Sequence, residues 1–188
     1  MSVHDRIVTK SSELFFHYGI NSISTDNISG ELGISKRTFY QHFESKEQLV
    51  EVIVSDEIDQ ARRNLRKLKM CGFNAVVEAI KICELDLKYK RLRSINYLRD
   101  IQKSYPAIWD QYEAFKEKYI ENVLIENIRC GILERYYWPD LNEKTTAGLW
   151  LEISYLNYAE QQAGESVRQH FIRGLLNPRG ISEYLFWQ

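Results

Sequence analysis

The stretch GISKRTFYQHFESKEQL, from Gly33 to Leu49, decides the fold. It begins with a glycine, which tolerates the unusual backbone angles of a tight turn. Cationic, polar and aromatic side chains then follow within a few positions. A helix of this composition is too polar to be buried all round and too aromatic to be solvated all round. We therefore expect a short helix, from about residue 35 or 36 to about residue 43 or 44, with a protein-facing side and a partner-facing side.

A second short amphipathic segment precedes this helix. Ser24 is expected to be its N-cap, because a serine hydroxyl can accept a backbone N–H of the next turn. The segment then runs over about residues 25–32 and carries the small Ser29, which suits a close helix crossing. Two short helices joined by a glycine turn form a helix-turn-helix. Its buried side is expected to hold Ile28, Leu32, Ile34, Phe39 and Phe43.

The outward side of the second helix is cationic and polar. Lys36, Arg37 and Gln41 remain on that side, near the helix N-terminus. In helix-turn-helix proteins this part of the helix enters the major groove of DNA. Lys and Arg side chains match guanine edges, and Gln matches adenine. The pattern therefore predicts protein core against Phe39 and Phe43, and DNA against the remaining side chains.

The rest of the chain repeats the apolar spacing of amphipathic helices and almost never alternates as strands do. Ser45 is expected to cap a helix that follows it, and Ala163–Gly164 is expected to part the last two long helices. The final residues are expected to form one more turn or short helix. The main helices are expected over about residues 4–18, 46–68, 106–133, 142–162 and 165–176.

These segments predict an all-α fold of about nine helices. The stretch MCGFN, residues 70–74, marks a boundary. We expect a three-helix head at residues 1–46 that carries the helix-turn-helix, a linking helix at residues 46–68, and a larger helical body at residues 70–188.

Composition and charge fit a soluble protein and set one condition on DNA binding. Hydrophobic residues make up 44% and charged residues 27% of the 188 residues. No apolar run approaches a membrane span or a signal peptide, so we expect a cytoplasmic protein without a membrane partner. Residues 1–46 hold five Lys or Arg and five Asp or Glu. DNA binding would therefore depend on cations that share one face.

No pattern indicates an enzyme, a metal site or a cofactor. The chain has no Gly-rich phosphate loop and no nucleophile motif, and its histidines are scattered. The three cysteines, Cys71, Cys83 and Cys130, form no Cys-x-x-Cys pair. Reduced and mostly buried thiols are expected, with a redox sensor as the alternative.

The stretch STDNISGELGISKRTFYQHFESKEQL closely resembles the DNA-binding signature of the TetR family of bacterial transcriptional regulators. The likeness begins at ELFFHYGI, continues through Leu49, and has a weaker counterpart in IENIRCGILERYYWPDLN. Two residues are unfavourable for a DNA-binding helix-turn-helix. Gly30 lies inside a helix, and Asp26 would repel phosphate if it faced DNA. The resemblance implies base contacts for Lys36, Arg37 and Gln41, and phosphate contacts for Thr25, Thr38, Tyr40, His42 and Lys46.

Some of these roles have structural alternatives. Tyr40 could pack against the following helix, and His42 could serve as an internal hydrogen-bonding residue. In the body, the resemblance implies a site for a small-molecule effector among aromatic side chains, each of which could instead fill the core. The candidate pocket residues are Tyr89, Tyr97, Trp109, Tyr112, Phe115, Tyr119, Trp150, Tyr155 and Tyr158.

The body is also expected to form a homodimer through its last two long helices. Their apolar stripes are Leu149, Trp150, Ile153 and Leu156 on one helix, and Val167, Phe171, Leu175 and Leu176 on the other. The resulting hypothesis is a ligand-responsive transcriptional regulator, a repressor that a small molecule releases from a palindromic double-stranded DNA operator. The alternative is a helical ligand-binding or protein-interaction module that does not bind an operator.

Overall fold

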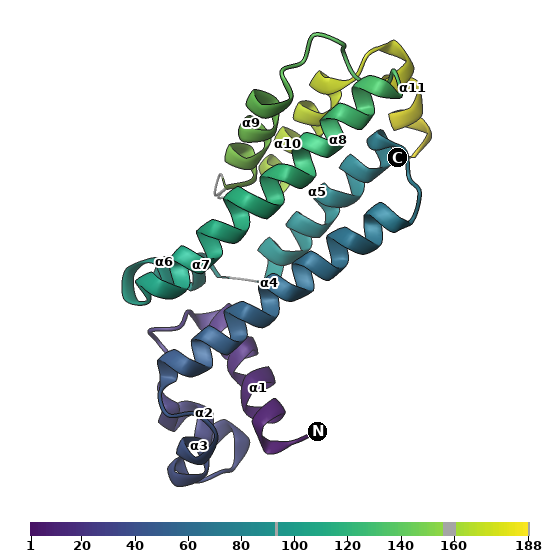
Figure 1. Cartoon of the computed structure of the whole chain (residues 1–188). Coiled ribbons are helices and arrows are strands. Elements are labelled where there is room, and N and C mark those ends of the chain that lie inside the picture. Colours follow the sequence, from purple (N-terminus) through teal and green to yellow (C-terminus); the bar gives the residue numbers. More distant parts are fainter. Residues whose placement is uncertain (93, 156–160, 188) are drawn as a thin grey trace. The chain divides into compact units, whose positions relative to one another are not determined.

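The computed structural model describes residues 1–92, 94–155 and 161–187, and within them all side chains except those of residues 87–92, 95, 155 and 161–164. This part of the chain is helical (Figure 1). It also has one isolated antiparallel bridge, between Tyr137 and Leu176. The expected all-α class is therefore confirmed. None of the described helices combines the length and apolarity of a membrane span. The helices are α1 Val3–Tyr18, α2 Thr25–Leu32, α3 Lys36–His42, α4 Lys46–Met70, α5 Ala75–Leu92, α6 Ile95–Ser104, α7 Pro106–Phe115, the π-helical η1 Lys116–Ile120, α8 Glu121–Leu133, α9 Glu143–Tyr155, α10 Gln161–Leu175 and α11 Pro178–Phe186.

The chain divides into two compact units. Unit 1 comprises Met1–Ala61 and Tyr89–Glu113, and unit 2 comprises Arg62–Lys88 and Ala114–Gln188. Unit 1 thus includes α6 besides the N-terminal helices, because the N–H of Ser94 donates to the carbonyl of Phe16 and joins the start of α6 to α1. The domain boundaries expected at residues 46 and 70 rest on chain order and motif, and they stay a prediction.

Polar caps fix where two helices of unit 1 begin. Ser24 and Asn27 form a reciprocal capping box at the start of α2. The hydroxyl of Ser45 accepts the N–H of Gln48 at 3.1 Å at the start of α4. Such caps satisfy backbone donors that have no partner within the helix. The capping roles expected for Ser24 and Ser45 are confirmed.

Gly19 ends α1 at a point where α6 comes close. Its φ is 86°, in the region that favours glycine. A Cβ at this position would lie 2.9 Å from the Cβ of Asn96 and 2.9 Å from a carboxylate oxygen of Asp100, both on α6. Glycine is therefore required here both by backbone angle and by space.

The core of unit 1 lies where α1 to α4 meet. The expected inward side chains Ile28, Phe39 and Phe43 are fully buried, while Leu32 and Ile34 are half-buried. This apolar contact area is the main source of stability for helices as short as α2 and α3. The buried set includes Ile7, Phe15, Ile28, Phe39, Phe43, Leu49, Val50 and Ile53.

Two expectations about the longer helices need correction. The helix expected over residues 106–133 contains the π-helical turn η1 between α7 and α8, a local widening that apolar periodicity does not reveal. The break expected at Ala163–Gly164 is wrong, because both residues lie inside α10. A glycine inside a helix costs about 1 kcal/mol relative to alanine, and burial of Ile172 and Leu175 on α10 outweighs that cost.

The core of unit 2 is organised around Tyr137, which follows α8. Its ring is buried, and its hydroxyl lies 3.0 Å from the carbonyl oxygen of Ala75 and 2.9 Å from the side-chain oxygen of Asn127. The Asn127 amide donates to the same Ala75 carbonyl at 3.0 Å. Burial raises the pKa of Tyr137 well above its usual value, so the phenol stays protonated.

Gly131 on α8 packs directly under the ring of Tyr137. A Cβ on Gly131 would overlap that ring, so one of the two groups would have to move. The N–H groups of Tyr136 and Tyr137 both donate to the carbonyl of Gly131, at 2.9 Å and 3.0 Å. The glycine therefore lets the chain fold back tightly at the end of α8.

The apolar stripes expected at a subunit interface are partly internal. Trp150, Leu175 and Leu176 are buried inside unit 2, where the Trp150 and Phe171 rings lie 5.6 Å apart. Assigning those three buried side chains to a partner-facing surface was therefore wrong, because helical spacing does not distinguish an internal face from a subunit interface. Leu149 is exposed, and Leu156 lies outside the described residues.

The cysteines differ in environment. Cys83 is buried, Cys130 is half-buried and Cys71 is exposed. Burial raises the pKa of the Cys83 thiol to about 12. The expectation of buried thiols holds for Cys83 and fails for Cys71, which lies in the turn after α4.

Candidate nucleic-acid interface

The turn between α2 and α3 fixes the direction of α3. Gly33 ends α2 with φ 64° in the left-handed region, which glycine adopts without steric cost. The N–H of Ile34 donates to the carbonyl of Ser29 at 3.0 Å and closes the turn. Ser35 then caps α3 by accepting the N–H of Thr38 at 3.0 Å. The helix-turn-helix expected from the sequence is therefore present.

The outer side of α3 carries the side chains predicted to read bases. Lys36, Arg37 and Gln41 are exposed, while Phe39 on the same helix is fully buried. In the described part of the chain, the side chains of Arg37 and Gln41 have no polar partner, so both are available to an external ligand. The helix therefore has the buried aromatic side and the exposed polar side that its composition predicts.

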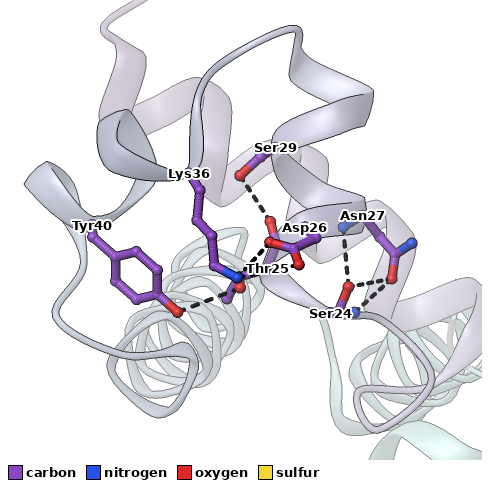
Figure 2. Close-up of polar contacts among 7 residues, drawn as sticks. All are labelled: Ser24, Thr25, Asp26, Asn27, Ser29, Lys36 and Tyr40. Carbon is purple, nitrogen blue, oxygen red and sulfur yellow. Dashed lines mark hydrogen bonds and ion pairs between the residues drawn. The ribbon is translucent and has the colours of Figure 1, made fainter.

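Thr25 and Tyr40 lie together across the two helices (Figure 2). Their hydroxyl oxygens are 3.5 Å apart. Tyr40 is 46% exposed, and its ring meets the Phe39 ring edge-on at 5.3 Å between centroids. The phenol therefore has an apolar contact on one side and an accessible hydroxyl on the other, an arrangement that can donate to a phosphate oxygen.

Lys36 forms an ion pair with Asp26 on α2 (Figure 2). The ammonium nitrogen lies 2.8 Å from one carboxylate oxygen and 3.2 Å from the other. The hydrogen bond to Asp26 is the main cause that raises the pKa of Lys36. The sequence identifies Asp26 as unfavourable for DNA binding, but it does not show that the carboxylate pairs with Lys36.

The contacts of Thr38 and His42 do not distinguish a structural role from a role in binding phosphate. The Thr38 hydroxyl shares a hydrogen bond with Ser35 at 2.8 Å and is half-buried. His42 is exposed at the end of α3, and its ring centroid lies 6.4 Å from that of His4 in an edge contact. Both side chains lie on the same short helix as the predicted base-reading residues.

Lys46 differs from the other predicted contacts. Its ammonium donates to the carbonyl of Ile20 at 2.6 Å and lies 5.7 Å from the centre of the Phe15 ring. Partial burial lowers the pKa of Lys46, and the nearby Asp100 opposes that shift. In this structure Lys46 holds the connector between α1 and α2, a role that the sequence motif does not indicate.

The predicted pocket residues are distributed over both units. Tyr97 is fully buried in unit 1, where its hydroxyl donates to Glu57 at 2.6 Å and its ring meets Phe16 edge-on. Trp109 and Tyr112, also in unit 1, are half-buried with ring centroids 5.6 Å apart. The side chains of Tyr89, Tyr155 and Tyr158 lie outside the described residues.

Within unit 2, two of the predicted pocket residues stack beside a cation. The rings of Phe115 and Tyr119 lie 5.5 Å apart and nearly parallel, at the π-helical turn. The Arg62 guanidinium lies 5.3 Å from the first ring centre and 5.8 Å from the second. Aromatic faces attract cations at such distances. The described residues contain no group of three or more His, Cys, Asp or Glu side chains that could hold a metal ion.

Comparisons with known proteins agree with this geometry. Residues 7–53 match the family model described as bacterial regulatory proteins, tetR family. The chain is 28% identical over 169 residues to the uncharacterized HTH-type transcriptional regulator YvaF of Bacillus subtilis, covering 78% of this chain and 88% of that protein. It is 25% identical over 174 residues to the HTH-type transcriptional regulator UidR of Escherichia coli K12, covering 90% and 87%.

A solved structure shows the same fold over the whole length. A TetR-family transcriptional regulator from Marinobacter aquaeolei VT8 matches with a TM-score of 0.77 and 18% identity, covering 100% of this chain and 97% of the other. The match confirms the arrangement of a helix-turn-helix region followed by a helical body. The family resemblance carried by residues 24–49 is confirmed by the family model, whose match includes these residues.

Proposed function

We propose that this chain, a DNA-binding transcriptional regulator of the TetR type, is a cytoplasmic repressor that a small molecule releases from its operator. The observation that carries the proposal is α3, whose Phe39 is buried while Lys36, Arg37 and Gln41 face outward. A helix seven residues long with this division is suited to lie in a major groove.

On DNA, the side chains that we propose as contacts on α2 and α3 divide into two groups. Arg37 and Gln41 can pair with guanine and adenine edges respectively. Thr25, Thr38, Tyr40 and His42 offer hydroxyl or imidazole groups that can donate to phosphate oxygens and so fix the position of the helix. We place Lys46 outside the direct contacts, because its ammonium already donates to the Ile20 carbonyl.

The test of DNA binding uses the duplex that lies upstream of the chain's own gene. Fluorescence anisotropy should show tighter binding to this duplex than to a random duplex of equal length. Replacing both Arg37 and Gln41 with alanine should reduce that preference by roughly tenfold or more, since each good base contact is worth about 1–3 kcal/mol. Equal binding of both duplexes by the wild-type protein would favour a helical module without an operator.

We also propose that the protein acts as a homodimer on a roughly palindromic site, with half-sites about one helical turn apart. We propose that exposed side chains of α9 and α10 form the subunit contact. One of them is Leu149, which is 53% exposed. Sedimentation at micromolar concentration should show a dimer. A monomer at that concentration would remove this part of the proposal.

The effector is proposed to bind the helical body at an apolar and aromatic site. The stacked Phe115 and Tyr119 rings beside the π-helical turn support this, because π turns often occur at functional sites. Release from DNA would follow if the effector prefers a conformation that binds DNA less well, and the size of the effect would equal that difference in affinity. A thermal-shift screen followed by gel shifts tests it: hits that stabilise the protein but leave operator affinity unchanged would contradict release.

A further inference from the structure

We propose that Asp26 restrains binding to DNA of any sequence, because its carboxylate holds the Lys36 ammonium away from DNA phosphates and so lowers the sequence-independent part of the affinity. The inference rests on the proposed DNA binding. It concerns α2, which supplies no predicted base contact. It assigns a role to Asp26, the acidic residue that would repel phosphate on a DNA-binding face.

The geometry places the pair on the candidate DNA-binding face. Asp26 is the second residue of α2 and Lys36 is the first residue of α3. Both oxygens of the carboxylate lie within 3.2 Å of the ammonium nitrogen. Tyr40 and Thr25 lie beside the pair in Figure 2, so the pair occupies the same face as the predicted phosphate contacts.

A purely stabilising role does not account for this pair. The Lys36 and Asp26 side chains are 56% and 65% exposed. Ion pairs between side chains this exposed contribute little to folding, because water and salt screen them. Their effect on a charged ligand that arrives at the same surface is larger, because DNA brings a row of phosphate charges against both residues.

The pair reduces the number of cations that act on phosphates. A lysine that touches a phosphate displaces condensed counterions, which makes binding salt-dependent. While Lys36 remains paired, its charge is balanced by Asp26 and it contributes little to this term. If Lys36 turns to DNA, the unpaired Asp26 carboxylate lies near phosphates and repels them. Either way, the sequence-independent part of the affinity falls.

The ion pair between Asp26 and Lys36 does not engage the neighbouring side chain of Arg37, which is predicted to contact a base. In the described part of the chain, the Arg37 side chain has no carboxylate partner, although it is adjacent to Lys36 in sequence. A sequence-independent term acts on operator and random DNA alike, so we expect Asp26 to lower both affinities and to leave their ratio, which the base contacts set, unchanged. Residues 1–46 have equal numbers of Lys or Arg and of Asp or Glu, as expected for a head whose affinity for random DNA is restrained.

The test compares Asp26→Asn with Glu31→Gln. Glu31 lies on the same helix, is exposed, and pairs instead with Lys10 at 3.3 Å, so both variants remove one negative charge from α2. Affinity for a random duplex is measured by anisotropy over a range of salt concentrations. Asp26→Asn should steepen the salt slope by about 0.9, which is roughly a 3.5-fold larger loss of affinity between 50 and 200 mM salt. Glu31→Gln should change the slope much less.

Two further arms isolate the cause. In a Lys36→Gln background, Asp26→Asn should steepen the slope less than it does in the wild type, because no ammonium is released and only the repulsion by the carboxylate is removed. The preference for the upstream duplex over the random duplex should stay the same in both variants, because both duplexes gain the same phosphate contact in Asp26→Asn. Equal slopes for the two acidic variants, or an effect of Asp26→Asn that is as large without Lys36 as with it, would overturn the inference while leaving DNA binding intact. A wild-type protein that binds no duplex at low salt would overturn the proposed function and this inference with it.

Discussion

The carboxylate of Asp100 on α6 accepts two hydrogen bonds from Asn21, one from the backbone N–H at 2.8 Å and one from the side-chain amide at 3.0 Å. The same amide also donates to the Ser104 hydroxyl at 3.0 Å. Asn21 lies in the connector between α1 and α2, so α6 holds the segment that leads into the helix-turn-helix. The position of α2 within unit 1 therefore depends on a residue of α6.

Replacing Asp100 with asparagine should destabilise unit 1. The change removes the negative charge that strengthens both hydrogen bonds from Asn21, and we expect a loss of about 1–2 kcal/mol in the free energy of unfolding. Urea unfolding measures the change. Asp110→Asn on α7 is the matched control, because Asp110 is exposed and surface changes usually stay within about 0.5 kcal/mol. Equal unfolding midpoints for the two variants would show that the Asp100 contacts do not hold the connector.

Gly19→Ala should be strongly destabilising. The φ of 86° disfavours alanine, and the new methyl group would lie within 2.9 Å of both Asn96 and Asp100. We expect a loss of about 2 kcal/mol or more, since backbone strain and the clash act together. Thermal unfolding checks this. A melting temperature equal to that of the wild type would mean that α6 shifts away without cost.

Gly30→Ala, in contrast, should increase the free energy of unfolding. Gly30 lies inside α2, its φ is not positive, and a Cβ there would meet nothing within 4 Å. Alanine restricts the unfolded chain and favours a helix, so we expect a gain of about 0.5–1 kcal/mol in the free energy of unfolding. The same thermal assay as for Gly19→Ala measures it. A decrease in stability would indicate that α2 needs the freedom of glycine.

Lys46→Met tests whether this lysine holds the connector or binds phosphate. Loss of the 2.6 Å hydrogen bond to the Ile20 carbonyl should lower the free energy of unfolding by about 1–2 kcal/mol. The salt dependence of DNA binding should change little, because the ammonium is already engaged. If instead the salt slope of DNA binding falls by about one and the stability is unchanged, Lys46 makes a phosphate contact.

The pKa of Cys83 predicts a pH effect on stability. Burial raises this pKa to about 12 from an ordinary value of 9.0. The folded-state pKa is above the unfolded one, so the contribution to stability is complete below pH 9 and is lost as the pH rises toward 12. Between pH 8 and pH 10 the wild type should lose about 1 kcal/mol more than Cys83→Ala. Parallel losses in the two proteins, measured by urea unfolding at each pH, would contradict this.

Local sequence signals predict the helix-turn-helix well. Capping by Ser24, the left-handed turn at Gly33 and burial of Phe39 each depend on residues a few positions apart, and short-range patterns record such contacts. The partners of Asn21 and Lys46 are long-range contacts that no local pattern contains. Apolar spacing on α9 and α10 likewise predicts helices correctly, but it does not say whether Trp150 or Leu175 faces its own core or another subunit.

The close contact of Gly131 with the Tyr137 ring constrains how this region can change during evolution. Position 131 cannot gain a side chain while a large ring stands at position 137, because that side chain needs the volume that the ring occupies. In homologous chains we expect the two positions to covary, with glycine at the first whenever a large ring stands at the second. Where the glycine is lost, a smaller residue should replace the tyrosine, and the hydroxyl that reaches Ala75 and Asn127 should be lost with it.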